Sequence, residues 1–93
     1  MEKYYLMPCE RQNQKSFGCK AVVEVGNDGT KVLYSYTTKI AKITASGLLV
    51  RLCDHDRKCS SPTTMRHLAS FCVHNGLEPI TKKAWNEMPR LRD

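Results

Sequence analysis

The sequence lacks several features that would assign it to a specialised class of protein. Its 93 residues contain no apolar run long enough for a membrane span, and the first residues do not form a signal peptide. No internal repeat, low-complexity segment or linker is present, and a second hydrophobic core would leave each half too small to fold unaided. We therefore expect a single domain over residues 1–93, cytoplasmic and with no membrane contact.

Long basic runs are also missing, although positive charge exceeds negative charge. Fifteen Lys and Arg residues against nine Asp and Glu residues give a formal net charge of +6, and the basic residues are scattered along the chain. Such a surplus keeps a small domain soluble, and it also favours contact with nucleic acid or an acidic protein surface. These two are the partners we expect, with a homo-oligomer as an alternative.

The cysteines show no C-x-x-C pair, the spacing with which zinc sites usually begin. Five of them, an odd number, occur in a chain without a secretory signal, so we expect reduced thiols and no disulfide framework. The best candidate metal ligands are Cys53, His55 and Cys59, with Cys72 or His74. Because their spacing is awkward and Cys72 is expected in the core, we predict no metal and no cofactor.

No local constellation for nucleophilic catalysis is present. A catalytic cysteine needs an imidazole against its thiolate and a third group that orients the ring. The sequence places no such set around His55, His67 or His74. We therefore expect a protein that is not an enzyme and has no catalytic residues.

The first half of the chain carries strand patterns. Residues 4–7 form a short apolar run, residues 10–16 a polar loop, and residues 20–25 a segment rich in β-branched side chains. The sequence Gly-Asn-Asp-Gly at 26–29 tolerates positive φ and predicts a β-hairpin.

The returning strand alternates from Thr30 onward. Val32, Tyr34 and Tyr36 share one face, and Leu33, Ser35 and Thr37 share the other. We expect the face with Val32 to be the buried one. Residues 40–43 and 48–53 are two further apolar segments, separated by a turn at 45–47. Residues 54–61 are polar and charged and predict a loop.

A capped amphipathic helix is predicted from about Pro62 to Asn75. Ser60 or Ser61 can accept hydrogen bonds from the first turn, and Gly76 suits the left-handed conformation that ends a helix. The side expected to face the sheet carries Met65, Leu68, Ala69, Cys72 and Val73. The opposite side is expected to carry Arg66, His67, Ser70 and His74.

These patterns predict an α+β fold. An antiparallel meander of four strands, or five if the returning strand bends near Thr38, packs against one main C-terminal helix. A short terminal helix is expected over residues 81–88, where Trp85 and Met88 are one turn apart.

Two features suggest a binding surface. Hydroxyl groups and basic side chains surround the helix start, where free N–H groups attract anions, although these hydroxyls more simply cap the helix. The residues concerned are Ser60, Ser61, Thr63, Thr64, Arg57, Lys58 and Arg66. Tyrosines on neighbouring strands can stack unpaired bases, but we favour burial in the core. They are Tyr4, Tyr5, Tyr34 and Tyr36.

Four segments resemble a family of short uncharacterised proteins found in bacteriophages and mobile elements of gut Firmicutes. They lie at residues 4–8, 15–21, 33–41 and 61–68, and the most specific are Ser-Tyr-x-Thr and Thr-Thr-x-Arg-His. The resemblance implies a phage or mobile-element accessory protein without an established activity.

The polar residues shared with that family, together with the helix start, form the binding surface that we predict. They are Ser35, Tyr36, Thr37, Ser61, Thr63, Thr64, Arg66 and His67. A strand end that meets the helix N-terminus would bring them together. We expect a noncatalytic binding module for nucleic acid or an acidic protein surface. The alternatives are a protein inhibitor of a host or defence factor and a structural homo-oligomer.

Overall fold

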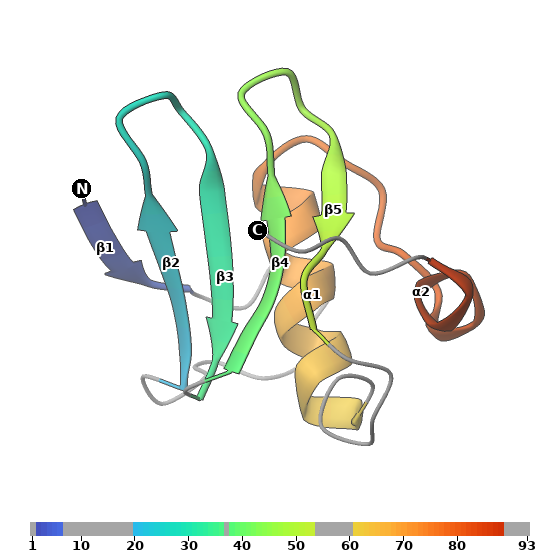
Figure 1. Ribbon diagram of the computed structural model, residues 1–93. Coiled ribbons are helices and arrows are strands. Elements are labelled where there is room, and N and C mark those ends of the chain that lie inside the picture. The colour runs from blue at the N-terminus through green and yellow to red at the C-terminus, as the bar shows by residue number, and fades with distance from the viewer. Residues whose placement is uncertain (1, 7–19, 37, 54–60, 89–93) are drawn as a thin grey trace.

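A computed structural model describes residues 2–6, 20–36, 38–53 and 61–88, and shows five strands followed by two helices (Figure 1). The elements are β1 (Glu2–Tyr5), β2 (Ala21–Val25), β3 (Lys31–Ser35), β4 (Thr38–Ile43), β5 (Leu49–Arg51), α1 (Pro62–His74) and α2 (Lys82–Glu87). The strands form one antiparallel sheet in the order β1-β2-β3-β4-β5. The predicted α+β meander with one main C-terminal helix and a short terminal helix is confirmed.

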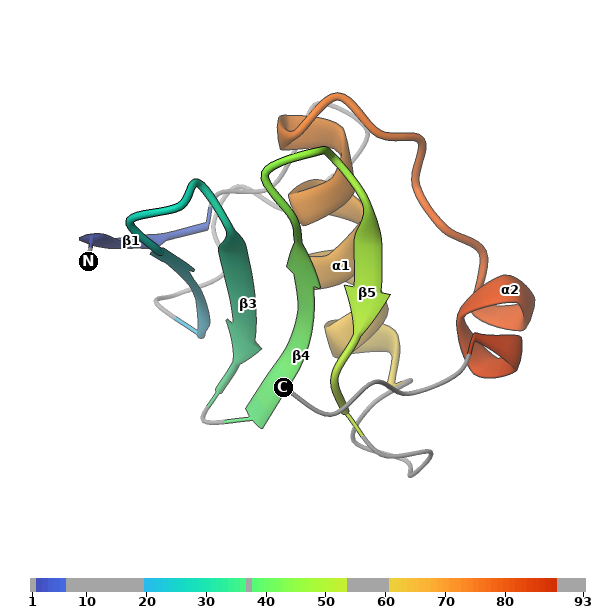
Figure 2. The same ribbon diagram turned by 45° about the horizontal axis from the view of Figure 1, so that its top comes forward.

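The helices lie on one face and at one edge of the sheet. In both views α1 runs behind β4 and β5, while α2 lies beyond β5 (Figures 1 and 2). The helix α1 also contacts β3. In the described part of the chain, neither helix has the length and apolar character needed to cross a membrane.

Two turns divide the strands as local sequence requires. The predicted hairpin between β2 and β3 is present, with Gly29 at a φ of 89° and the Thr30 N–H donating to the Asp28 carboxylate at 3.0 Å. Between β3 and β4, Tyr36 has a φ of 57°, which breaks the long strand. The sheet therefore has five strands, as predicted for a bend near Thr38.

A bulge in β4 changes which side chains reach the core. Leu33 pairs with Ala41 but Tyr34 pairs with Lys39, so Ile40 is the extra residue. Ile40 and Ala41 are consequently both fully buried, which simple alternation along a strand would forbid. The Ile40 carbonyl accepts hydrogen bonds from the backbone of Leu52 and Cys53, which extends the β4–β5 contact.

The prediction for the buried face of β3 is wrong. Leu33 is 0% exposed and Ser35 is 3% exposed, whereas Tyr34 is half-buried and Tyr36 is 57% exposed. Leu33 pairs with Val23, which also faces α1, and this register turns Tyr34 to the other side. Alternation has period two and does not by itself say which face is inside.

The main helix begins and ends where the sequence predicts. Ser61 is its N-cap, Asn75 its C-cap, and Gly76 follows with a φ of 77°. The predicted polar side is wrong for His67 and Ser70, which are buried. The buried residues of α1 are Thr64, His67, Leu68, Ser70, Phe71 and Cys72.

A buried arginine and a tryptophan join α2 to β5. Trp85 is the buried residue of this six-residue helix, whose N-cap is Thr81. Arg51 is 1% exposed, lies over the Trp85 ring at 4.9 Å, and donates from Nη1 to the Trp85 carbonyl at 2.6 Å. The contact fixes the C-terminal segment against the edge of the sheet.

Several predicted features lie outside the described residues. These are the loop at 10–16, the loop at 54–60, and Cys9, Thr37, His55, Arg57, Lys58, Cys59 and Ser60.

Candidate functional site

The end of β3 and the first turns of α1 meet, as the predicted binding surface requires. The Ser35 hydroxyl lies 2.8 Å from Nδ1 of His67, and the rings of Tyr36 and His67 have centroids 6.5 Å apart. Ser35 and His67 are nevertheless buried, at 3% and 1% exposure. This pair is therefore a polar link within the core and is closed to a partner.

The hydroxyls at the helix start serve the helix itself. The Ser61 hydroxyl oxygen accepts from the Thr64 N–H at 3.2 Å and lies 3.1 Å from the Thr64 hydroxyl. Thr64 is 3% exposed, while Thr63 is half-buried and Arg66 is exposed. The interpretation that Ser61 caps the helix is confirmed, so four of the eight predicted residues have a role in the fold: Ser35, Ser61, Thr64 and His67.

The electrostatic surroundings of His67 favour a neutral ring. Burial lowers the pKa of His67, and the positive charges of Lys20 and Arg66 lower it further. The neutral imidazole and the Ser35 hydroxyl then form one hydrogen bond across the 2.8 Å contact, in which Nδ1 donates or accepts according to the tautomer.

The lowered pKa predicts a pH-dependent stability. Below about pH 6.5 this histidine is protonated in the unfolded chain, whereas in the folded protein it stays neutral until the pH reaches its lowered pKa. The free energy of unfolding should therefore fall as pH falls below 6.5, by up to about 1.4 kcal/mol per pH unit until the folded-state pKa is reached.

Urea titrations of wild type and His67→Gln from pH 8 to 5 measure this effect. The glutamine variant keeps a polar group beside Ser35 but does not titrate, so the difference between the two proteins isolates His67. Parallel pH profiles for the two proteins would refute the prediction.

A second candidate surface is the side of the sheet that faces away from α1, here called the outer face. Strand pairing places its side chains in two rows that cross the sheet. The first row is Tyr5, Val22, Tyr34 and Lys39. The second row is Lys3, Glu24, Val32, Lys42 and Val50.

The outer face is accessible over β1 to β4. Tyr5 is 60% exposed and Tyr34 is half-buried, while Val50 at the β5 end of the second row is buried. Of the elements that the structure describes, none packs on this face between β1 and β4 (Figures 1 and 2).

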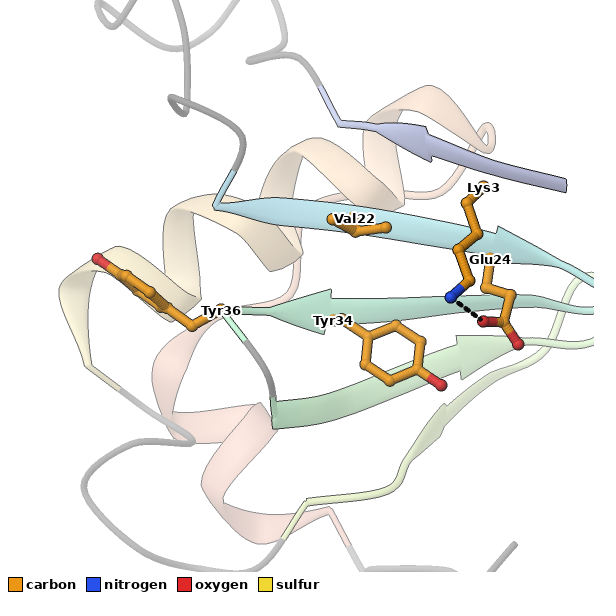
Figure 3. A pocket seen from close by; sticks show the side chains of 5 residues that line it. All are labelled: Lys3, Val22, Glu24, Tyr34 and Tyr36. Carbon is orange, nitrogen blue, oxygen red and sulfur yellow. Dashed lines mark ion pairs between the residues drawn. The ribbon is translucent and has the colours of Figure 1, made fainter.

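Two adjoining hollows mark the β1 side of the outer face. One, of about 250 Å³, is lined by Lys3, Val22, Glu24, Tyr34 and Tyr36 (Figure 3). The other, of about 360 Å³, is lined by Lys3, Tyr4, Tyr5 and Val22. The hollows share a lysine and the short valine side chain, which lies between the two tyrosines of the first row.

Positive charge predominates on the outer face. Its rows contain three lysines and one glutamate among the described residues. Glu24 pairs with Lys3 at 3.5 Å (Figure 3). Lys39 and Lys42 lie on β4. The pKa of the Asp28 carboxyl group is lowered mainly by hydrogen bonds with Thr30, and the charge of Lys42 contributes.

The cysteines do not form a reactive or metal-binding centre in the described residues. Cys53 is disulfide-bonded, so the prediction that all five cysteines are reduced thiols is wrong for Cys53. Burial raises the pKa of the free Cys72 thiol to about 11, which keeps it protonated and unreactive. No three His, Cys, Asp or Glu side chains of the described chain converge as metal ligands.

Sequence reasoning named the tyrosines but placed the site elsewhere. Tyr5 and Tyr34 were expected in the core, and Lys3, Lys39 and Lys42 were counted only toward net charge. Part of a signal was available, because Glu24 in β2 and the two lysines of β4 are charged and favour water. The lysines are three residues apart, however, and only the bulge at Ile40 places both on the outer face.

A known protein family matches most of the folded chain. Residues 6–87, which begin just after β1 and include α2, match the model of a family described as being of unknown function, DUF8033. The chain belongs to this family. No curated protein and no solved structure matches this DUF8033 member. A match to uncharacterised proteins was predicted and is confirmed for DUF8033; an origin in phages or mobile elements stays a prediction.

Proposed function

We propose that this DUF8033 protein is a noncatalytic nucleic-acid-binding module that uses the outer face of its sheet. One observation carries the proposal: on β1 to β4 this face exposes tyrosines and lysines side by side, and no described element packs on it. The proposed site thus lies on the sheet instead of at the start of α1.

The charge of the outer face suits a polyanion. Lysine side chains attract phosphates at long range, and each phosphate that they neutralise releases counterions into solution. Lys39 and Lys42 lie on the same strand, in neighbouring rows of the outer face. One nucleic-acid backbone that runs along β4 would pass both lysines.

Part of the predicted surface lies beside this site. The Lys20 ammonium is 5.8 Å from the ring centre of the exposed Tyr36 at the end of β3, and Arg66 is exposed on α1. Lys20 and Arg66 add positive charge near the site, whereas Tyr36 lies outside its first row. A setting in a phage or mobile element, and a cytoplasmic location, belong to the same proposal; the disulfide at Cys53 is unusual for a reducing compartment.

Binding to a labelled mixed-sequence oligonucleotide should fall steeply between 50 mM and 200 mM salt. Fluorescence anisotropy measures the slope of log affinity against log salt. The double variant Lys39→Gln/Lys42→Gln should weaken binding and reduce that slope by about 2, because two phosphate contacts are lost.

The matched control is Lys82→Gln/Lys83→Gln, which removes the same charge from two exposed lysines of α2. Equal effects of the two double variants would show that net charge, and not the outer face, determines binding. Displacement of the oligonucleotide by polyglutamate at matched charge would instead favour an acidic protein as partner.

A further inference from the structure

We infer that the nucleic acid bound by the outer face is single-stranded, with unpaired bases stacked on Tyr34 and Tyr5. This inference rests on the proposed function and adds the class of ligand. It follows from the placement of the two rings, from the width of the sheet and from the position of its charges.

The two tyrosines are placed as a pair of stacking platforms. Tyr5 and Tyr34 both pair with Val22, one from each neighbouring strand. They are therefore two strand spacings apart, a total of roughly 10 Å. The short valine between them leaves the floor of the adjoining hollows. Aromatic rings on a sheet accept the faces of unstacked bases, whatever their sequence.

A duplex does not fit this arrangement. Its bases are already stacked on one another, so tyrosine rings reach them only through a groove. The four strands from β1 to β4 span roughly 14 Å, whereas the major groove is about 12 Å wide and admits a helix or a two-stranded ribbon. A duplex would touch the lysines and leave the tyrosines unused.

The charges place the backbone and the bases on different parts of the outer face. Glu24 lies in the hollow beside Val22 and repels phosphates, while its partner Lys3 moderates that repulsion. Lys39 ends the row that carries both tyrosines and lies directly beside Tyr34. A nucleic-acid strand with its backbone along β4 and its bases toward β2 would place its phosphates beside Lys39 and away from Glu24.

Tyr36 is not part of the stacking pair. Its ring points away from Tyr34 in Figure 3 and lies beside His67 on α1. It is exposed, like Tyr5, and therefore offers a tyrosine control outside the row.

The test compares a fluorescent 12-nucleotide strand with the same sequence as a duplex, each titrated with the full chain at about 50 mM salt. We expect the single strand to bind at least 10-fold more tightly. Tyr34→Leu should weaken single-strand binding by about 5- to 150-fold, the range for loss of one stacked base. Tyr34→Phe should bind like wild type, and Tyr5→Leu should weaken binding in the same range.

The salt slope separates stacking from charge. Tyr34→Leu should keep the wild-type slope, because the lysines still contact phosphate. Circular dichroism confirms that each variant is folded. Tyr36→Leu should change affinity by less than about 3-fold, below the range for a lost stacked base.

Each contrary result has a distinct meaning. Equal or tighter binding of the duplex, or an unchanged affinity of Tyr34→Leu, would overturn the single-strand inference and leave the proposed function standing. A larger loss in Tyr36→Leu than in Tyr34→Leu would overturn the assignment of the stacking pair. Absence of binding to either oligonucleotide would overturn both proposals.

Discussion

Replacement of Trp85 by alanine is expected to lower the free energy of unfolding by about 3–5 kcal/mol, the range for truncation of a large buried aromatic side chain. Trp85 is 0% exposed, whereas its neighbours Lys83, Ala84 and Asn86 are exposed. A helix of six residues is too short to be stable on its own, so docking of this one ring holds α2 in place.

Urea denaturation followed by far-ultraviolet circular dichroism measures the loss, since the variant has no tryptophan fluorescence. Lys83→Ala, two residues away in α2 and exposed, is the matched control and should change stability by less than about 0.5 kcal/mol. A loss below 1 kcal/mol in Trp85→Ala would mean that α2 contributes little to the fold.

Arg51→Ala is expected to lower the free energy of unfolding by about 3 kcal/mol. The substitution removes a long buried side chain that packs on the Trp85 ring, and it leaves the Trp85 carbonyl without the Nη1 donor. A second bond, from Nε to the Cys53 carbonyl at 3.2 Å, is lost as well.

Arg66→Ala, which truncates an exposed arginine of α1, is the comparison for Arg51→Ala in urea titrations at pH 8. A double-mutant cycle with Trp85→Ala should show non-additive losses, because the two side chains share one contact. Additive losses would contradict a joint role.

The burial of Arg51 also affects how the charge of the protein is counted. One of its fifteen basic residues fastens α2 to β5 and has 1% exposure, so it does not face a partner. Lys31 likewise donates to the Asn75 side chain at the C-cap of α1, at 2.7 Å. Net charge alone therefore overstates the basic surface, and the position of each side chain decides what a polyanion can contact.

The pairing of Ser35 with His67 explains why polar residues occur at two positions that the sequence assigned to a binding surface. Each satisfies the other inside the core, which removes the cost of an unpaired buried polar group. In the described residues no buried side-chain nitrogen or oxygen lacks a partner. The contact between β3 and α1 thus explains the polar residues Ser35 and His67, and the cap at Ser61 explains Thr64.

The sequence by itself determined the elements that depend on neighbouring residues. The turn at 26–29, the Ser61 cap, the end of α1 at Gly76 and the short terminal helix all follow from backbone preferences of a few adjacent residues. The five-strand meander and its helix follow from the order of these elements.

Only the tertiary structure decided which face of each element is buried. Alternation in β3 is equally consistent with either face, and pairing with β2 and the bulge at Ile40 made the choice. With this face of β3 inside, Ser35 meets His67, which is 32 residues away in the sequence, and the two form a buried hydrogen bond. Tyr34 then faces outward. Contacts between distant segments are not encoded in local spacing, so the proposed site became visible only when the strands were placed side by side.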